Sequence, residues 1–154
     1  MKTIIFTISD KEYGLDIAHV QEVIRVRKFI PIPESADFVE GVMSLRGKVI
    51  TLINLRKKLG LTAKDIGKTD RIIVTHIKDH SLGIIVDTVS GVLNIESSIV
   101  TSPDDTLKNA VYLKGIAKVG SRLIMIMDLA GLFSNESIAT LNKVKDHVEL
   151  RRKS

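Results

Sequence analysis

The sequence contains no cysteine, which excludes disulfide bonds, thiolate metal ligands and cysteine nucleophiles. It also has no tryptophan, and aromatic residues make up only 4% of the chain, so the core must be built from aliphatic side chains. The same scarcity argues against a stacking platform for single-stranded nucleic acid, which needs exposed aromatic rings among basic residues. The N-terminal apolar run ends at Ser9 and is too short for a signal peptide or a membrane span. We therefore expect a soluble protein that reaches a membrane only through a partner.

Isoleucine, valine and leucine supply most of the hydrophobic content, which is 44% of the 154 residues. This content is sufficient for the core of one compact unit, and β-branched side chains favour sheet. The net charge is +5, with much of the excess at Arg56–Lys58 and at Arg151–Lys153. We interpret both groups as solvated charge at helix ends, while a basic protein that binds nucleic acid stays open as an alternative.

No constellation of residues for catalysis or metal binding stands out. The segment Gly41–Lys48 resembles a phosphate-binding loop, but its spacing is one residue too long, and Val49 occupies the position where serine or threonine would bind magnesium. His76 and His80 lie four residues apart, but they flank an expected strand-to-turn junction, where that spacing does not bring side chains together. We therefore predict no catalytic residue, no metal and no cofactor, and we expect the protein to bind partners.

The hydrophobic periodicity predicts a mainly β chain. The expected strands of the first half lie at 3–8, 13–17, 41–45 and 48–53. The segment 19–26 is ambiguous between helix and strand, and we assign a short turn at 16–19 followed by a strand. Asn54 and Gly60 are suited to begin and end a helix of one to two turns. Hydrophobic residues three to four apart predict a longer amphipathic helix over about 135–150.

The second half of the chain repeats the first. Gly115–Leu129 aligns without a gap on Gly41–Leu55, and Leu82–Ile95 aligns on Tyr13–Val26. Each copy holds about five short strands and a helical turn. So few strands cannot bury both faces of an open sheet, and closing the sheet into a small barrel also removes its edges.

We predict a single domain over 1–154, made of two packed five-stranded barrels that arise from this duplication. Their approximate limits are 12–70 and 71–133, with the strand at 3–8 completing the arrangement and the C-terminal helix at about 135–150 following. The nearly continuous apolar runs Val49–Ile53 and Leu123–Met127 indicate strands that are covered on both faces. We therefore expect the barrels to pack face to face.

The repeat also separates residues that a barrel needs from residues that are free to serve function. Gly41 aligns with Gly115, so this glycine is expected to serve the backbone. Glu22 aligns with Gly91, so the charge of Glu22 is not required by the barrel.

The two hairpin turns differ in the same way. Arg46-Gly47 has glycine at the second central position, as types II and I′ require, whereas Gly120-Ser121 has it at the first, as type II′ allows. The hairpin therefore does not need an arginine at its apex. Arg46 is either a solvated turn residue or a contact to carboxylates or carbonyls of a partner, for which a guanidinium is well suited.

Several short motifs occur in a fixed order along the chain: EYGLDI at 12–17, VQEV at 20–23, FVEGV at 38–42, LRG at 45–47, NLR at 54–56, LGIIVD at 82–87, Val92 and LKG at 113–115. With these motifs the chain resembles the CheW family of chemotaxis coupling proteins. The resemblance extends from Thr3 to about Asn142. Ser44 and Thr51 depart from the family pattern, which usually has asparagine and proline at these positions.

This resemblance implies two five-stranded SH3-like barrels and an adaptor without catalytic activity, which links the cytoplasmic tips of methyl-accepting chemoreceptors to the histidine kinase CheA. It implies that the regulatory domain of CheA binds the first barrel, at positions that correspond here to Val20, Glu22 and Gly41. It implies that the receptor binds at the groove between the barrels, at Arg46, Gly83 and Val92. The expected location is the cytoplasm, beside membrane receptor arrays, with no nucleic acid bound and no direct insertion into the membrane.

Two alternatives stay open. The chain could be a CheW-like regulatory module of a larger signalling protein, either CheA itself or a protein of the CheV type, although its start at Met1 and its tail favour a complete chain. A basic double barrel that binds nucleic acid is the other alternative, and its affinity for RNA or DNA would fall steeply with salt.

Overall fold

The computed structural model describes residues 1–32, 36–62, 64–77, 79–96, 100–101 and 112–133. Most of these residues lie in short strands, and the predicted mainly β fold is confirmed. The helix expected at about 135–150 lies outside the described residues.

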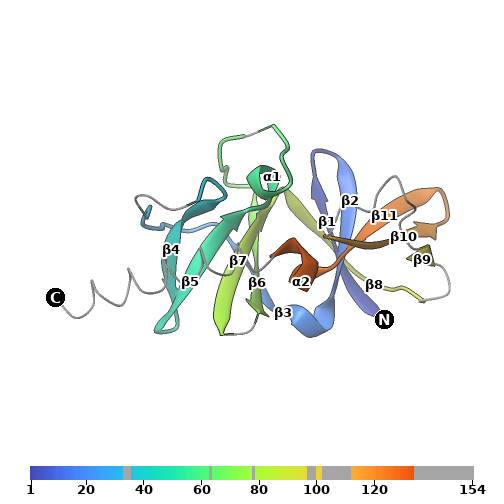
Figure 1. The fold of residues 1–154 in the computed structure, drawn as a ribbon, viewed down its shortest axis with the longest axis horizontal. Helices are drawn as coiled ribbons and strands as arrows, with labels where there is room; N and C mark the ends of the chain where they lie inside the picture. The colour runs from blue at the N-terminus through green and yellow to red at the C-terminus, as the bar shows by residue number, and fades with distance from the viewer. Residues whose placement is uncertain (33–35, 63, 78, 97–99, 102–111, 134–154) are drawn as a thin grey trace.

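Figure 1 shows the elements in their order along the chain. They are β1 (Lys2–Ile8), β2 (Lys11–Asp16), the 3-10 helix η1 (Ile17–His19), β3 (Val20–Arg25), β4 (Val39–Leu45), β5 (Lys48–Asn54), α1 (Leu55–Lys58), β6 (Arg71–Ile77), β7 (His80–Val86), β8 (Thr88–Asn94), β9 (Val100–Thr101), β10 (Leu113–Val119), β11 (Arg122–Met127) and α2 (Leu129–Leu132). The expected strands and both short helices are confirmed. The ambiguous segment 19–26 is the strand β3, preceded by one helical turn, as we assigned it.

Two sheets form the molecule, and they share one strand order. The five-stranded sheet runs β3-β6-β7-β5-β4, and the six-stranded sheet runs β8-β1-β2-β11-β10-β9. When the two repeats are aligned, β3 corresponds to β8, β6 to β1, β7 to β2, β5 to β11 and β4 to β10. Equivalent strands therefore occupy equivalent places. The parallel pairs β5–β7 and β2–β11 also correspond to each other.

The sheets do not coincide with the two repeats, and the expected division near residue 70 needs correction. The five-stranded sheet is one continuous block from Val20 to Val86, while the six-stranded sheet takes strands from both sides of that block (Figure 1). Each repeat thus gives two strands to one sheet and the rest to the other. The similarity between the repeats identifies equivalent strands. Because a strand and its equivalent in the other repeat offer the same edge for pairing, this similarity does not tell whether a strand pairs within its own repeat or with the other one.

Each sheet curls, because the chain that follows the edge strand β3 or β8 returns to pair with the strand β4 or β10 near the opposite edge of the same sheet. After β3, Ile30 donates its N–H to the Val42 carbonyl at 2.8 Å and accepts the Val42 N–H at 2.9 Å. In the six-stranded sheet β9 takes the place that Ile30 has in the five-stranded sheet, because Thr101 of β9 pairs with Ile116, the counterpart of Val42. Within the described residues no longer ladder joins the edges, so both barrels are partly open rather than fully closed.

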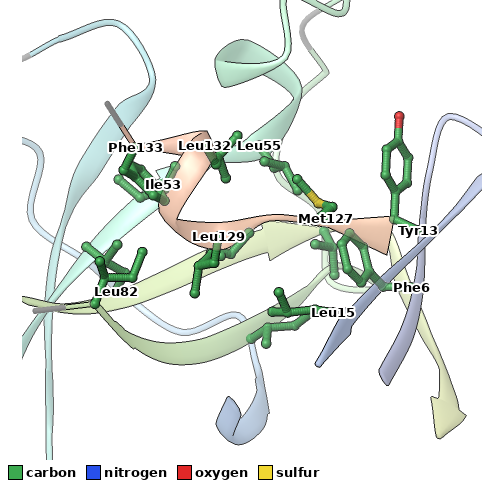
Figure 2. Close-up of a cluster of buried hydrophobic side chains, with 14 of the residues drawn as sticks. Phe6, Tyr13, Leu15, Ile53, Leu55, Leu82, Met127, Leu129, Leu132 and Phe133 are labelled. Atoms are coloured by element: carbon green, nitrogen blue, oxygen red, sulfur yellow. The ribbon is translucent and has the colours of Figure 1, made fainter. Parts of the chain in front are cut away.

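The main core lies between the two sheets, which confirms the predicted face-to-face packing. Side chains alternate between this core and a smaller one inside each sheet: Phe6 points into the main core, while its neighbour Ile5 points into the six-stranded sheet. The short helix α2 lies between the sheets, and its Leu129 and Leu132 are buried in the main core (Figures 1 and 2). Figure 2 shows this core with side chains from both sheets, among them Phe6, Tyr13, Leu15, Ile53, Leu82 and Met127.

Candidate functional site

Arg46 lies at the apex of the β4–β5 turn in an unusual backbone conformation. Its φ is +51° and that of Gly47 is +79°, so both central residues have the positive φ of a type I′ turn, one of the two expected types. In the β10–β11 turn the first central residue, Gly120, has a φ of +62°, as a type II′ turn requires. A side chain disfavours the left-handed region by about 1–2 kcal/mol. Arg46 therefore adopts a strained backbone conformation, whereas its counterpart Gly120 adopts the same positive φ without strain, because glycine has no side chain.

The Arg46 side chain pairs with Glu22 of β3. Its Nη1 donates to both carboxylate oxygens of Glu22 at 2.8 Å. The Arg46 side chain is 73% exposed and that of Glu22 is 24% exposed, so the pair stabilises the fold by at most about 1 kcal/mol. The resemblance assigned these two residues to different partners, and the structure brings them together. At the equivalent positions of the other sheet stand Gly91 and Gly120, which have no side chain to pair.

Val20 lies two residues before Glu22, at the start of β3. It is half-buried and packs against the edge of the main core. Val23 on the same strand is 37% exposed. The Glu22–Arg46 ion pair therefore joins β3 to the β4–β5 turn, while Val20 and Val23 lie on the other face of β3.

Gly41 is buried against the chain that follows β3. A Cβ atom at this position would lie 2.2 Å from the carbonyl oxygen of Ile30, a backbone atom that is hydrogen-bonded to Val42. Glycine is thus required because two backbones approach closely at the contact that curls the sheet. This agrees with the expectation that Gly41 serves the backbone.

Gly83 is buried inside the five-stranded sheet. A Cβ atom there would lie 2.7 Å from Cγ2 of Ile72 and 2.8 Å from Cδ2 of Leu52. Its counterpart Gly14 is equally crowded, with Cγ2 of Thr3 at 2.7 Å. Neither glycine lies where a partner could touch it, so both positions are explained by packing.

Val92 is, with Arg46, an exposed member of the predicted receptor-binding set. It lies on β8, at the edge of the six-stranded sheet, and 49% of its surface is accessible. The structure therefore does not place Val92 on the sheet that carries Arg46. Its counterpart Val23 is also exposed, so this strand position faces outward in both sheets.

Sequence reasoning missed a charged contact where the chain passes from one sheet to the other. Asp87 is the only residue between β7 and β8. Its carboxylate accepts hydrogen bonds from the Arg56 guanidinium and, at 2.9 Å, from the N–H of Ser9. Its own N–H donates to the Thr7 carbonyl at 3.0 Å. The counterparts of Asp87 and Arg56 are Ala18 and Ala130, so comparison of the repeats could have found this pair.

The environment of Asp87 holds it in the charged form. Burial raises the pKa of its carboxyl, but the hydrogen bonds from Arg56 and from the Ser9 N–H outweigh burial, and the net pKa lies below its ordinary value. The same hydrogen bond raises the pKa of Arg56. The side chains of Arg56 and Asp87 are only 15% and 19% exposed. Removal of one partner of this pair should therefore cost more stability than removal of one partner of the exposed pair at Arg46, because a charge would be left partly buried without its partner.

Every buried side-chain nitrogen and oxygen atom of the described residues has a hydrogen-bond partner. A hollow of about 250 Å³ is lined by Glu40, Asn54, Lys57, Lys64, Asp65 and Ile66. In it Glu40 accepts hydrogen bonds from Asn54 Nδ2 and Lys57 Nζ, both at 2.9 Å. The residues that the structure describes contain no cluster of three or more side chains suited to hold a metal ion. Among their helices, none has the length and apolar character to cross a membrane.

The chain is similar to proteins of one known family over nearly its whole length. The CheW-like domain model matches residues 2–137. The chemotaxis protein CheW of Klebsiella aerogenes is 33% identical, with 94% of this chain and 89% of that protein aligned, and CheW of Thermotoga maritima is 36% identical, with 80% and 82% aligned. The crystal structure of the scaffolding protein TtCheW from Thermoanaerobacter tengcongensis superposes with a TM-score of 0.81 and 34% identity, covering 88% of this chain and 94% of that one. The chain therefore belongs to the CheW family of chemotaxis proteins.

Proposed function

We propose that this protein is a non-catalytic adaptor in the cytoplasm, which couples the cytoplasmic tips of chemoreceptors to the regulatory domain of the histidine kinase CheA. The observation that carries the proposal is the similarity over nearly the whole chain to CheW proteins, one of which is described as a scaffolding protein. Within the described residues no catalytic constellation competes with this function.

The architecture suits an adaptor that works by fixed geometry. The main core joins both sheets and α2, so surfaces on the two sheets are held rigidly relative to each other. A partner bound to one surface can then affect a partner bound to the other without any chemical step. Contacts of standard size, about 800 Å² per partner, fit on a molecule of this size.

The site residues divide into contacts and supports. We propose that Val20 and Glu22 contact the kinase and that Arg46 and Val92 contact the receptor, because all four side chains reach the surface. Gly41 and Gly83 are buried, and we propose that they act by preserving the backbone and packing beneath these surfaces.

A capture experiment with a purified receptor-tip fragment and the CheA regulatory domain tests the proposal. We expect Arg46→Glu to reduce capture of the receptor fragment by about tenfold, while the thermal unfolding midpoint stays within a few degrees of the unaltered protein. Capture of the kinase domain should change less. Failure of the unaltered protein to capture either fragment would contradict the adaptor function itself.

The ion pair provides a matched control. If Arg46 acts only through the ion pair that joins β3 to the β4–β5 turn, the double variant Glu22→Arg with Arg46→Glu rebuilds this pair with reversed polarity and restores receptor capture. We expect no restoration, since in the proposal the Arg46 side chain itself touches the receptor. Full recovery in the double variant would show that the ion pair, and not the Arg46 side chain, is what receptor capture requires.

A further inference from the structure

The basic side chains of the described residues differ in whether a carboxylate lies close to them. One group has carboxylate partners within 4.0 Å: Arg46, Arg56, Lys57, Lys64 and Arg122. A second group gathers where β3 ends and β6 begins, and no ion pair within the described part of the chain involves any of its members. We name this group the β3–β6 basic patch, and it consists of Arg25, Arg27, Lys28, Lys68 and Arg71.

Two arginines form the centre of the β3–β6 basic patch. Arg25 and Arg71 are direct cross-strand partners in the antiparallel β3–β6 ladder, so their side chains leave the sheet on the same face. Like charges that face each other in this way destabilise a sheet. Among the residues that the structure describes, no carboxylate forms an ion pair with either arginine, so nothing in this part of the chain offsets the cost of the pair to stability.

Arg71 is held in place by the chain that precedes it. Its Nη1 donates to the carbonyl of Thr69 at 2.9 Å and to that of Asp70 at 3.0 Å, and lies 3.4 Å from that of Lys68. Nε and Nη2 take no part in these bonds. The guanidinium is thus fixed beside Arg25 with donors to spare, so that little side-chain freedom is lost when an anion binds.

The acidic residue adjoining Arg71 is already engaged. The Asp70 side chain is only 4% exposed, with Lys64 Nζ at 3.1 Å and the Gly67 N–H at 2.9 Å from its two oxygens. Its charge is therefore balanced by groups other than Arg25 and Arg71. The positive potential of the β3–β6 basic patch consequently faces solvent.

We propose that the β3–β6 basic patch docks an acidic segment of a protein partner. Pairs of guanidinium groups suit carboxylates because each can form two parallel hydrogen bonds. Ile30, two residues beyond Lys28, is 59% exposed and supplies an apolar contact beside the charges, a mixture typical of protein interfaces. The large exposed hydrophobic side chains of the described residues include no aromatic ring on which a nucleic acid base could stack.

This docking surface is separate from the one proposed for the kinase. Val20 pairs with Thr75 at one end of the β3–β6 ladder, while Arg25 pairs with Arg71 at the other end. Binding of an acidic segment at the β3–β6 basic patch therefore does not require the proposed contacts with the kinase, and each kind of binding can be lost without the other.

The test uses the full chain and a synthetic peptide of glutamate residues interspersed with leucine, with binding followed by titration calorimetry. We expect the double variant Arg25→Glu with Arg27→Glu to weaken binding by about tenfold or more, because two charge-assisted contacts are lost. The matched control is Lys114→Glu with Lys118→Glu, which changes the net charge equally on exposed positions of β10. That control should weaken binding by less than about twofold.

Two further measurements keep the outcomes distinct. Arg25→Glu removes a like-charge contact, so its unfolding midpoint should equal or exceed that of the unaltered protein, and weak binding cannot then be due to misfolding. Equal weakening in both double variants would overturn the proposal in favour of a general charge effect. Tighter binding of single-stranded DNA or of phosphatidylserine vesicles than of the peptide, lost with Arg25→Glu and Arg27→Glu, would overturn the choice of a protein partner.

Discussion

At its β4–β5 turn the five-stranded sheet carries Arg46, paired with Glu22, whereas the six-stranded sheet carries Gly120 and Gly91 at the equivalent positions. The strand order, the bulge positions and the parallel pairs are the same in both sheets. The scaffold therefore tolerates either set of residues. A charged pair that one copy has and the other lacks must be explained by something other than the fold.

The crossings between the sheets differ in the same manner. The β7–β8 crossing is fixed by Asp87 and Arg56, while the β2–β3 crossing passes through η1 with Ala18 at the place of Asp87. At the latter, the Asp16 carboxylate accepts a hydrogen bond from the Ala18 N–H at 3.0 Å, a contact within the turn itself. One crossing is thus held by the side chains of Asp87 and Arg56 and by backbone groups of Thr7 and Ser9, and the other by a local turn.

The largest effect is expected at Gly41. In Gly41→Ala the new Cβ would meet the Ile30 carbonyl oxygen at 2.2 Å, a backbone atom that cannot rotate away. We expect a loss of about 3 kcal/mol in the free energy of unfolding, measured by urea denaturation. Gly83→Ala is the comparison, because it meets only side-chain methyl groups that can shift, and a loss as large as that of Gly41→Ala would contradict the distinction.

The next effect concerns the charged crossing. Arg56→Ala would leave the half-buried carboxylate of Asp87 without its main partner, and we expect a loss of about 2 kcal/mol. Lys118→Ala, on an exposed position of β10, should change stability by less than about 0.5 kcal/mol. If the two variants unfold at the same urea concentration, Asp87 does not need Arg56.

The same pair predicts a dependence on pH. Because the pKa of Asp87 is lowered in the folded protein, its contribution is present above the unfolded pKa of about 4 and is lost as the pH falls through the folded value. The stability difference between the unaltered protein and Asp87→Asn should therefore shrink as the pH falls below about 4. Unfolding curves between about pH 7 and about pH 3 measure it, and a difference that is constant over this range would argue against the ion pair.

The smallest effects are expected at the two turns. Gly120→Arg places a side chain in the left-handed region, and the new arginine has no carboxylate to pair with, because Gly91 stands at the position equivalent to Glu22. We therefore expect the free energy of unfolding to fall by about 1 kcal/mol. Arg46→Gly relieves the same strain but removes the pair with Glu22, so these terms nearly cancel. Thermal denaturation of both variants checks this, and a large loss in Arg46→Gly would mean that the ion pair is a major part of the fold.

Local features of the fold could be predicted from sequence because their causes are local. Asn54 caps α1 by accepting the Lys57 N–H at 3.2 Å, and Gly60 follows the helix with a φ of +72°, as their residue types indicate. The position of glycine in each turn limited the β4–β5 turn to types II and I′ and allowed type II′ for the β10–β11 turn. The pairing of strands between copies did not follow, because equivalent strands present equivalent edges.

The candidate site was predicted only in part for a similar reason. Glu22 and Arg46 were each singled out by the repeat, yet their contact depends on how β3 passes the β4–β5 turn, which no short-range pattern encodes. Asp87 was missed because its partners come from α1 and from the β1–β2 turn. The assignment of Val20, Glu22, Arg46 and Val92 to partners stays a prediction.

The continuous block from Val20 to Val86 has a consequence for exchanging parts between relatives. A chimera joined just before Val20 and just after Val86 would replace the five-stranded sheet as a unit and leave every ladder of both sheets within one parent. A chimera joined near residue 70, where the repeats meet, would divide both sheets between parents. Recombination within this family should therefore be tolerated at the crossings and not at the boundary of the ancestral duplication.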